Sequence, residues 1–214
     1  MGLNSINNLV TRAGVLSVVL VFLNPLASGF EKESGTVGAR KDMFTQLPFQ
    51  NLPGPDEIKK DFVRLEFTPL GDPELKMFFL APKDWKTQPI TVKKKTLKRD
   101  HMTTVPLVLV TSPKLRARIE VNYTRVPEAV DLKEWSLAYL KGNRLKLLNS
   151  QPGEFSGRKV FDTLVKAPKG EHVRMTFSRH KDRIVIFACS TAKLAYPEFA
   201  QIFGLATVSF KMAS

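Results

Sequence analysis

Cysteine is nearly absent from this chain of 214 residues, since Cys189 is the only one. A lone cysteine cannot form an internal disulfide, so packing must hold the fold together. Cys189 follows an apolar, β-branched run, where a small buried side chain is the ordinary role and a reactive thiol is the alternative. The scaffolds of small disulfide-rich domains are therefore excluded.

Recognisable catalytic signatures are also missing. The sequence has no HExxH helix, no Gly-x-Ser-x-Gly turn and no phosphate-binding loop. The three histidines, His101, His172 and His180, are each flanked by cationic or turn residues, which is typical of the surface. Gly153 and Gly157 are interpreted as turn glycines. We therefore predict no catalytic residue, no cofactor and no metal, and a protein that is not an enzyme.

Acidic residues are few compared with basic ones, 20 against 33, which gives a net charge of +13. This surplus favours acidic protein surfaces, anionic lipid head groups or nucleic acid as partners, or it serves only solubility. The densest basic run consists of Lys93, Lys94, Lys95, Lys98 and Arg99. Burial of unpaired ammonium groups is costly, so we expect this run on a loop or an edge strand. There it either binds a partner or protects the edge from aggregation.

The first 29 residues have the three-part pattern of a secretory signal peptide. A polar start up to Arg12 precedes the apolar run Ala13 to Leu23, and small residues follow at Ala27, Ser28 and Gly29. The apolar run is shorter than the ~20 residues of a typical span, so cleavage is favoured over a membrane anchor. We expect an exported chain in the periplasm or cell envelope, with no membrane span in its mature part, and export argues against nucleic acid as a partner.

The remainder divides into residues 30–61, a polar arm or linker, and residues 62–214, a single domain. Strands are predicted at Phe62 to Phe67, Leu75 to Leu80 and Val105 to Thr111. Arg116 to Thr124 alternates between apolar and polar residues, which predicts a strand with one face buried and one exposed. No internal repeat supports a second domain.

Helix and turn signals follow. Asp131 and Glu134 form a capping box that predicts a helix to about Lys141, with Leu132, Trp135, Ala138 and Tyr139 on its apolar stripe. Two further strands are expected, Arg144 to Leu148 and Arg158 to Val165, separated by a turn-rich segment from Asn149 to Gly157.

The stretch from Val173 to Phe210 predicts a hairpin followed by a helix. Val173, Met175 and Phe177 alternate with Arg174, Thr176 and Ser178, which indicates one buried and one wet face. A turn from Arg179 to Arg183 leads to the apolar run Ile184 to Ala188, which we expect deeper in the sheet. The helix that follows places Leu194, Phe199, Ile202, Phe203 and Ala206 at helical spacing, with Pro197 near its first turn.

We expect one core between the sheet and this helix. Its predicted members are Met175, Phe177, Ile184, Ile186, Trp135, Phe199, Ile202 and Phe203. Trp85 is expected to close a strand end within the core.

The order of these elements resembles the PsbP family of photosystem II extrinsic subunits, with its bacterial and plastid relatives, and the periplasmic DcrB family. The matching marks are Phe78 to Trp85, the strand Arg118 to Tyr123, the helix around Leu132 to Leu140, the turn Phe155 to Arg158, and the hairpin, helix and closing Val208 to Phe210. The resemblance covers residues 62 to 211, and its evidence is the order and spacing of these marks.

This resemblance implies an α+β fold, an α/β sandwich with a twisted, mainly antiparallel sheet and flanking helices. It also implies a non-enzymatic accessory or assembly subunit that binds a protein partner in a bacterial envelope complex. One alternative is a lumenal photosystem-associated accessory protein in the thylakoid. The other is a small-ligand-binding protein or an enzyme with a pocket between sheet and helix.

Overall fold

A computed structural model describes residues 52–90, 102–155 and 157–213, which belong to one compact unit. The described helices are α2 (Pro55–Asp61), α3 (Leu132–Gly142) and α4 (Tyr196–Ser209). The described strands are β1 (Phe62–Phe67), β2 (Met77–Pro82), β3 (Lys86–Pro89), β4 (Val105–Thr111), β5 (Ala117–Arg125), β6 (Lys146–Phe155), β7 (Arg158–Lys166), β8 (His172–His180), β9 (Arg183–Thr191) and β10 (Lys211–Met212).

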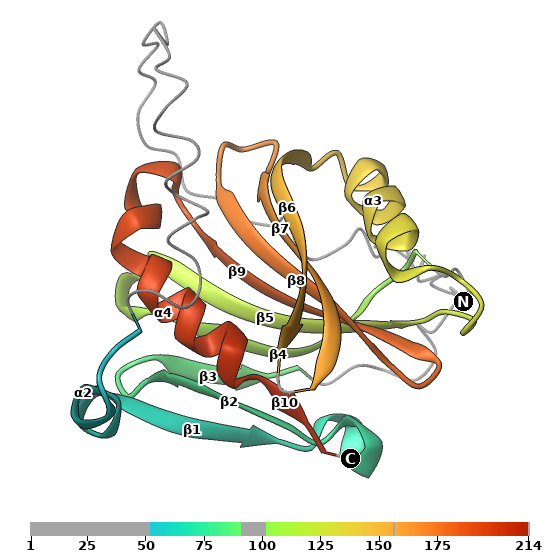
Figure 1. Ribbon diagram of the computed structural model, residues 1–214. Helices are drawn as coiled ribbons and strands as arrows, with labels where there is room; N and C mark the ends of the chain where they lie inside the picture. Colours follow the sequence, from blue (N-terminus) through green and yellow to red (C-terminus); the bar gives the residue numbers. More distant parts are fainter. Residues whose placement is uncertain (1–51, 91–101, 156, 214) are drawn as a thin grey trace, which may run out of the picture. The chain divides into compact units, whose positions relative to one another are not determined.

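These strands form two sheets with antiparallel pairing throughout (Figure 1). The larger sheet has seven strands in the order β3-β4-β5-β9-β8-β7-β6, and the smaller has the order β1-β2-β10. β9 lies in the interior of the larger sheet, between β5 and β8, and every one of its residues is buried. This confirms the prediction that the apolar run Ile184 to Ala188 lies deep.

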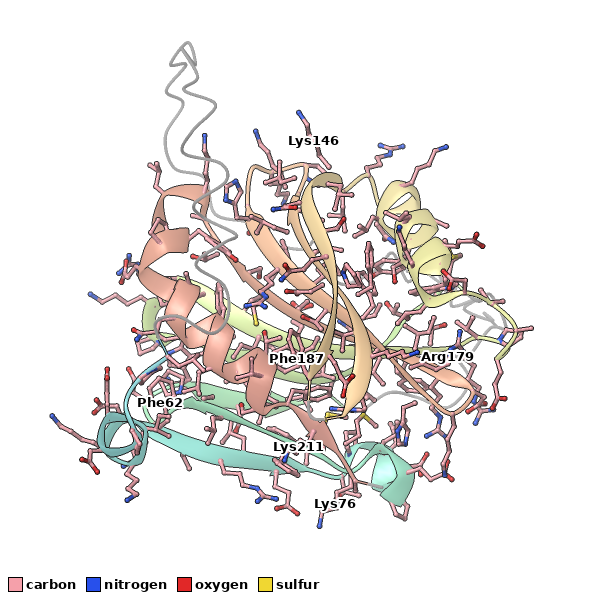
Figure 2. All side chains as sticks on the ribbon, in the orientation of Figure 1. Phe62, Lys76, Lys146, Arg179, Phe187 and Lys211 are labelled. Atoms are coloured by element: carbon pink, nitrogen blue, oxygen red, sulfur yellow. The ribbon has the colours of Figure 1, made fainter. Side chains whose placement is uncertain are left out.

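Both faces of the larger sheet are covered. On one face α4 and the smaller sheet enclose a core in which Phe79 contacts Phe187 edge to face at 5.2 Å between ring centres. Phe187, labelled in Figure 2, points from β9 toward this core. On the other face α3 packs against β8, and Trp135 and Tyr139 lie edge-on to Phe177. The architecture is therefore the predicted α+β sandwich, with a second small sheet that the sequence did not reveal.

The prediction of a wet face on β8 is wrong. Arg174 is 0% exposed and Thr176 is also buried, because their side chains lie on the face that α4 covers. The same correction applies to β5, where Arg118, Glu120 and Asn122 are buried although the pattern placed them in water. Alternation identified the two faces correctly, but covering elements bury both.

The predicted core divides between these two faces. Met175, Phe177, Ile184, Ile186 and Trp135 are buried on the α3 side of the sheet. Phe199 and Phe203 are buried on the α4 side, and Ile202 packs there only partly buried. Phe177 is the partner of Ile186, so the predicted strand residues share the face that α3 covers, whereas α4 packs on the opposite face.

Leu194 is the clearest failure of the helical pattern. It is 93% exposed and lies in a single 3-10 turn, Lys193–Ala195, before α4 begins at Tyr196. Pro197 occupies the first turn of α4, as predicted. Because proline is favoured at the start of a helix, it sets the beginning of α4 after Leu194, and the leucine projects outside the buried stripe.

The segment from Asn149 to Phe155 is strand, not turn. β6 continues through Pro152 and Gly153 and pairs with β7 up to the partners Phe155 and Arg158. β6 is an edge strand of the described sheet, so the missing N–H of Pro152 need not disrupt a second ladder. The turn itself includes Gly157, whose φ of +75° is the left-handed conformation that glycine adopts most readily.

The observed bounds of α3 and of the β8–β9 turn are closer to those predicted from the sequence. The oxygen of Asp131 accepts a hydrogen bond from the backbone N–H of Glu134 at 2.9 Å, which confirms the predicted start of α3. Ala138 is exposed, however, and Leu140 takes its place on the buried stripe. Lys181 and Asp182 alone form the β8–β9 turn.

The shortest strands were missed. β3 has only four residues, and β10 has two and follows α4, which itself includes the Val208 and Ser209 of the predicted closing segment. Strands of this length contain too few residues to establish a period.

Candidate functional site

The predicted partner-binding residues Lys93, Lys94, Lys95, Lys98 and Arg99 lie outside the described residues. Their described neighbours are β3, which ends at Pro89, and β4, which begins at Val105. β3 is an edge of the described seven-stranded sheet. The prediction that this run binds a partner therefore remains a prediction.

A buried polar cluster lies on the α3 side of β5. Arg118 donates from Nε to the Ser190 hydroxyl at 2.7 Å, and the same nitrogen lies 3.1 Å from the Glu120 carboxylate. Burial raises the pKa of Glu120 above its ordinary value. The positive charge of Arg118 opposes this effect, and the negative charge of Glu171 adds to it. Burial also raises the pKa of Tyr139 to about 12, with a smaller contribution from the charge of Glu120. A carboxyl with a raised pKa beside an arginine is a common feature of active sites and of internal ion pairs alike.

A second cluster lies between the sheet and α4. Arg174 makes a two-pronged contact with Asp162, from Nε at 3.2 Å and from Nη2 at 2.7 Å. The hydroxyl of Thr176 donates to the same carboxylate at 2.8 Å. Arg174 and Asp162 are both 0% exposed, so these groups are bound to one another away from solvent. This geometry joins the neighbouring strands β7 and β8.

Neither cluster was predicted from the sequence. Each residue was assigned to a solvated face or left unassigned, because charged side chains at alternating strand positions are normally exposed. Asp162 and Thr176 are direct partners across β7 and β8, and Arg174 is opposite Leu164. The pairing of these segments depends on strand register, which a single sequence does not specify.

The two described histidines both lie at least partly inside the protein. His172 is buried, contrary to the predicted surface position, and His180 is half-buried. Burial lowers the pKa of both histidines, and His101 lies outside the described residues. Within the described ranges, no three His, Cys, Asp or Glu residues are grouped so that they could hold a metal ion.

Cys189 is expected to resist thiol reagents in the native protein. Its side chain is 0% exposed, and burial raises its pKa to about 12, so the reactive thiolate is scarce. Reaction with Ellman's reagent should be at least ~100-fold slower than in denaturant, because both access and ionisation are suppressed. The rates are compared by absorbance with and without guanidinium chloride. Similar rates in both conditions would contradict the buried position.

An open groove lies between the end of β1 and the β3–β4 edge. It has a volume of about 220 Å³ and is lined by Phe67, Thr68, Pro69, Leu70, Ile90, Leu107 and Val108. The described part of this lining is mainly apolar, and none of its seven residues is charged.

No family model and no curated protein matches the sequence. Among the described residues, no helix has the length and apolar character needed to cross a membrane.

Two solved structures have a similar fold. The first is the solution structure of cyanobacterial PsbP (CyanoP) from Synechocystis sp. PCC 6803, with a TM-score of 0.52 and 14% identity over 77% of this chain and 99% of that one. The second is LpqN of Mycobacterium tuberculosis, described as involved in cell envelope biogenesis, with a TM-score of 0.51 and 10% identity over 75% of this chain and 100% of that one. The chain thus has the PsbP-like fold that the order of its sequence motifs predicted.

Proposed function

We propose that this protein is an exported, non-enzymatic accessory or assembly subunit that binds a protein partner in a bacterial envelope complex. The distribution of charge carries the proposal. Among the described residues, the buried charged side chains are three arginines and two carboxylates, which nearly balance: Arg118, Arg174, Arg183, Glu120 and Asp162. Most of the net charge of +13 is therefore available to an acidic partner outside the core.

The similar structures are consistent with this role. LpqN is described as involved in cell envelope biogenesis, and the fold is shared with cyanobacterial PsbP. A lumenal photosystem subunit is accordingly the second candidate. The paired geometry of Arg118 with Glu120 and of Arg174 with Asp162 favours binding over catalysis, because these groups are committed to structural contacts.

We further propose that Lys93, Lys94, Lys95, Lys98 and Arg99 contribute to partner binding. The test is capture of the tagged full chain from the cells that produce it, at about 50 and about 500 mM salt, so that electrostatic attraction is present in one sample and screened in the other. Replacement of all five residues with glutamine should leave folding intact, slow association and weaken its salt dependence.

A matched control removes the same charge elsewhere. Glutamine at the exposed residues Lys59, Lys60, Lys133, Lys159 and Lys211 gives an equal net charge and should leave capture nearly unchanged. If the five-residue basic-run variant associates as fast and as tightly at low salt as the parent, the run has no part in recognition. If the parent enriches no protein over an unrelated tagged chain, the accessory role itself is wrong.

A further inference from the structure

One end of the seven-stranded sheet gathers lysines from segments far apart in the sequence. The strand register aligns Lys86 with Thr111, Ala117 with Thr191, Thr191 with His172, His172 with Lys166, and Lys166 with Lys146. The loops that extend beyond this row add further cations. The resulting group, here called the lysine end, consists of the exposed residues Lys86, Lys114, Lys146, Lys166, Lys169 and Lys193.

Carboxylates lie near cations at both ends of the sheet. At the opposite end Arg183 lies 3.2 Å from Asp72 and 3.3 Å from Glu74, and Lys181 lies 2.7 Å from Glu74. At the lysine end Glu198 lies beside Arg116, Glu171 lies 3.9 Å from Arg118, and Asp84 precedes Lys86 in the chain. The six lysines of this end outnumber these three carboxylates. Burial lowers the pKa of His172, and the positive charges of Lys193 and Lys166 lower it further.

Leu194 projects from the same end. It follows Lys193 directly in the turn before α4 and is 93% exposed, whereas the other exposed large apolar side chains among the described residues range from 36% to 43%. Leu147 and Leu148 are among these, and they follow Lys146 at the start of β6. Figure 2 labels Lys146 where β6 begins, at the edge of the sheet next to the β7–β8 loop.

We propose that the lysine end, with Leu194 as its apolar tip, docks on an anionic lipid surface. The row crosses seven neighbouring strands, about 30 Å at the ordinary strand spacing, which suits a broad surface better than a small ligand. Lysine is a compact, hydrated charge without the planar fork of arginine, and it matches a fluid layer of head groups that offers no fixed geometry. A leucine exposed beside such cations can enter the acyl boundary while the lysines remain at the head groups.

This inference is independent of the proposed protein partner, because its test uses lipids alone. The full chain is mixed with vesicles of phosphatidylcholine, or of phosphatidylcholine with about 30% phosphatidylglycerol, and binding is measured by sedimentation. Lys146→Gln, Lys166→Gln and Lys193→Gln together should weaken binding to the anionic vesicles on the order of 100-fold, from roughly fivefold per lysine. Leu194→Ser should weaken it about tenfold or more, because the leucine no longer leaves water on docking.

The matched control carries Lys133→Gln, Lys159→Gln and Lys211→Gln, which remove the same charge from exposed sites away from this end. It should keep most of the binding. Every variant retains the apolar run Ala13 to Leu23 and the Lys93 to Arg99 segment, so their contributions cancel in the comparison. Equal losses in the two triple variants, or equal binding of the parent to neutral and anionic vesicles, would overturn the proposal.

A second measurement reports on the tip itself. Leu194→Cys places an exposed thiol in a chain whose other cysteine is buried, so an environment-sensitive dye can be attached at position 194 selectively. Its emission should shift to shorter wavelength with anionic vesicles and remain unchanged with neutral ones. An unchanged spectrum with anionic vesicles would reject the lipid surface as the partner of this end. The same conclusion would follow if a lysine-end variant bound vesicles normally but lost a protein partner, and this end would then be assigned to a protein contact.

Discussion

Replacement of Phe203 with alanine is expected to lower the free energy of unfolding by about 3–5 kcal/mol. Phe203 is 0% exposed and stacks on Phe199 with ring centres 6.1 Å apart, while Tyr196 contacts it at 6.0 Å. Truncation of the ring removes its buried apolar area and leaves a cavity in the interface between α4 and the sheet. Chemical denaturation followed by tryptophan fluorescence or circular dichroism measures the difference.

Leu194 provides the matched control for this experiment. The periodicity placed both residues on one helical stripe, but Leu194 is almost fully exposed. Leu194→Ala should therefore change stability by less than about 0.5 kcal/mol, as for an ordinary surface position. A loss below about 1 kcal/mol for Phe203→Ala would mean that α4 does not pack on the sheet as described.

The second large effect is expected at the buried ion pair. Asp162→Asn should cost about 3–5 kcal/mol, because it leaves the guanidinium of Arg174 buried without its counter-charge. The cost exceeds that of one ordinary hydrogen bond, since Asp162 also accepts the hydroxyl bond from Thr176. The free energy of unfolding from urea denaturation at neutral pH gives the comparison with the parent.

Two further variants separate a buried charge from a general loss of packing. Asp162→Leu combined with Arg174→Met removes both charges and should recover much of the stability, because no unpaired ion remains in the core. Glu198→Gln breaks the half-exposed pair with Arg116 and should cost no more than about 1 kcal/mol. If Asp162→Asn costs as little as Glu198→Gln, the Arg174 site is solvated and the buried pairing is wrong.

Local signals in the sequence were sufficient for most individual elements. The capping residue Asp131, the proline near the start of α4 and the alternation around Met175 each depend on neighbours within a few residues. Those preferences operate before any tertiary contact forms, so α3, α4 and the β8–β9 hairpin were predicted with small errors at their ends. The order of the elements also predicted the PsbP-like fold.

Boundaries that depend on position within a sheet were predicted less well. Pro152 and Gly153 are strong turn signals, yet they lie inside β6 because an edge strand has only one neighbour to satisfy. Whether a strand is at an edge depends on the pairing of the whole sheet. The residues around Pro152 and Gly153 therefore do not indicate that β6 is an edge strand.

The placement of charged and exposed residues also depended partly on the sequence and partly on the tertiary structure. Composition alone determined that the protein is strongly basic, and alternation determined which residues share a face of each strand. Only the tertiary structure decided that Arg174 is buried against Asp162 and that Leu194 is exposed among lysines from five different parts of the chain. The physical reason is that periodicity reports the direction of a side chain relative to its own backbone, whereas burial and charge clustering depend on which distant segment covers or adjoins that face.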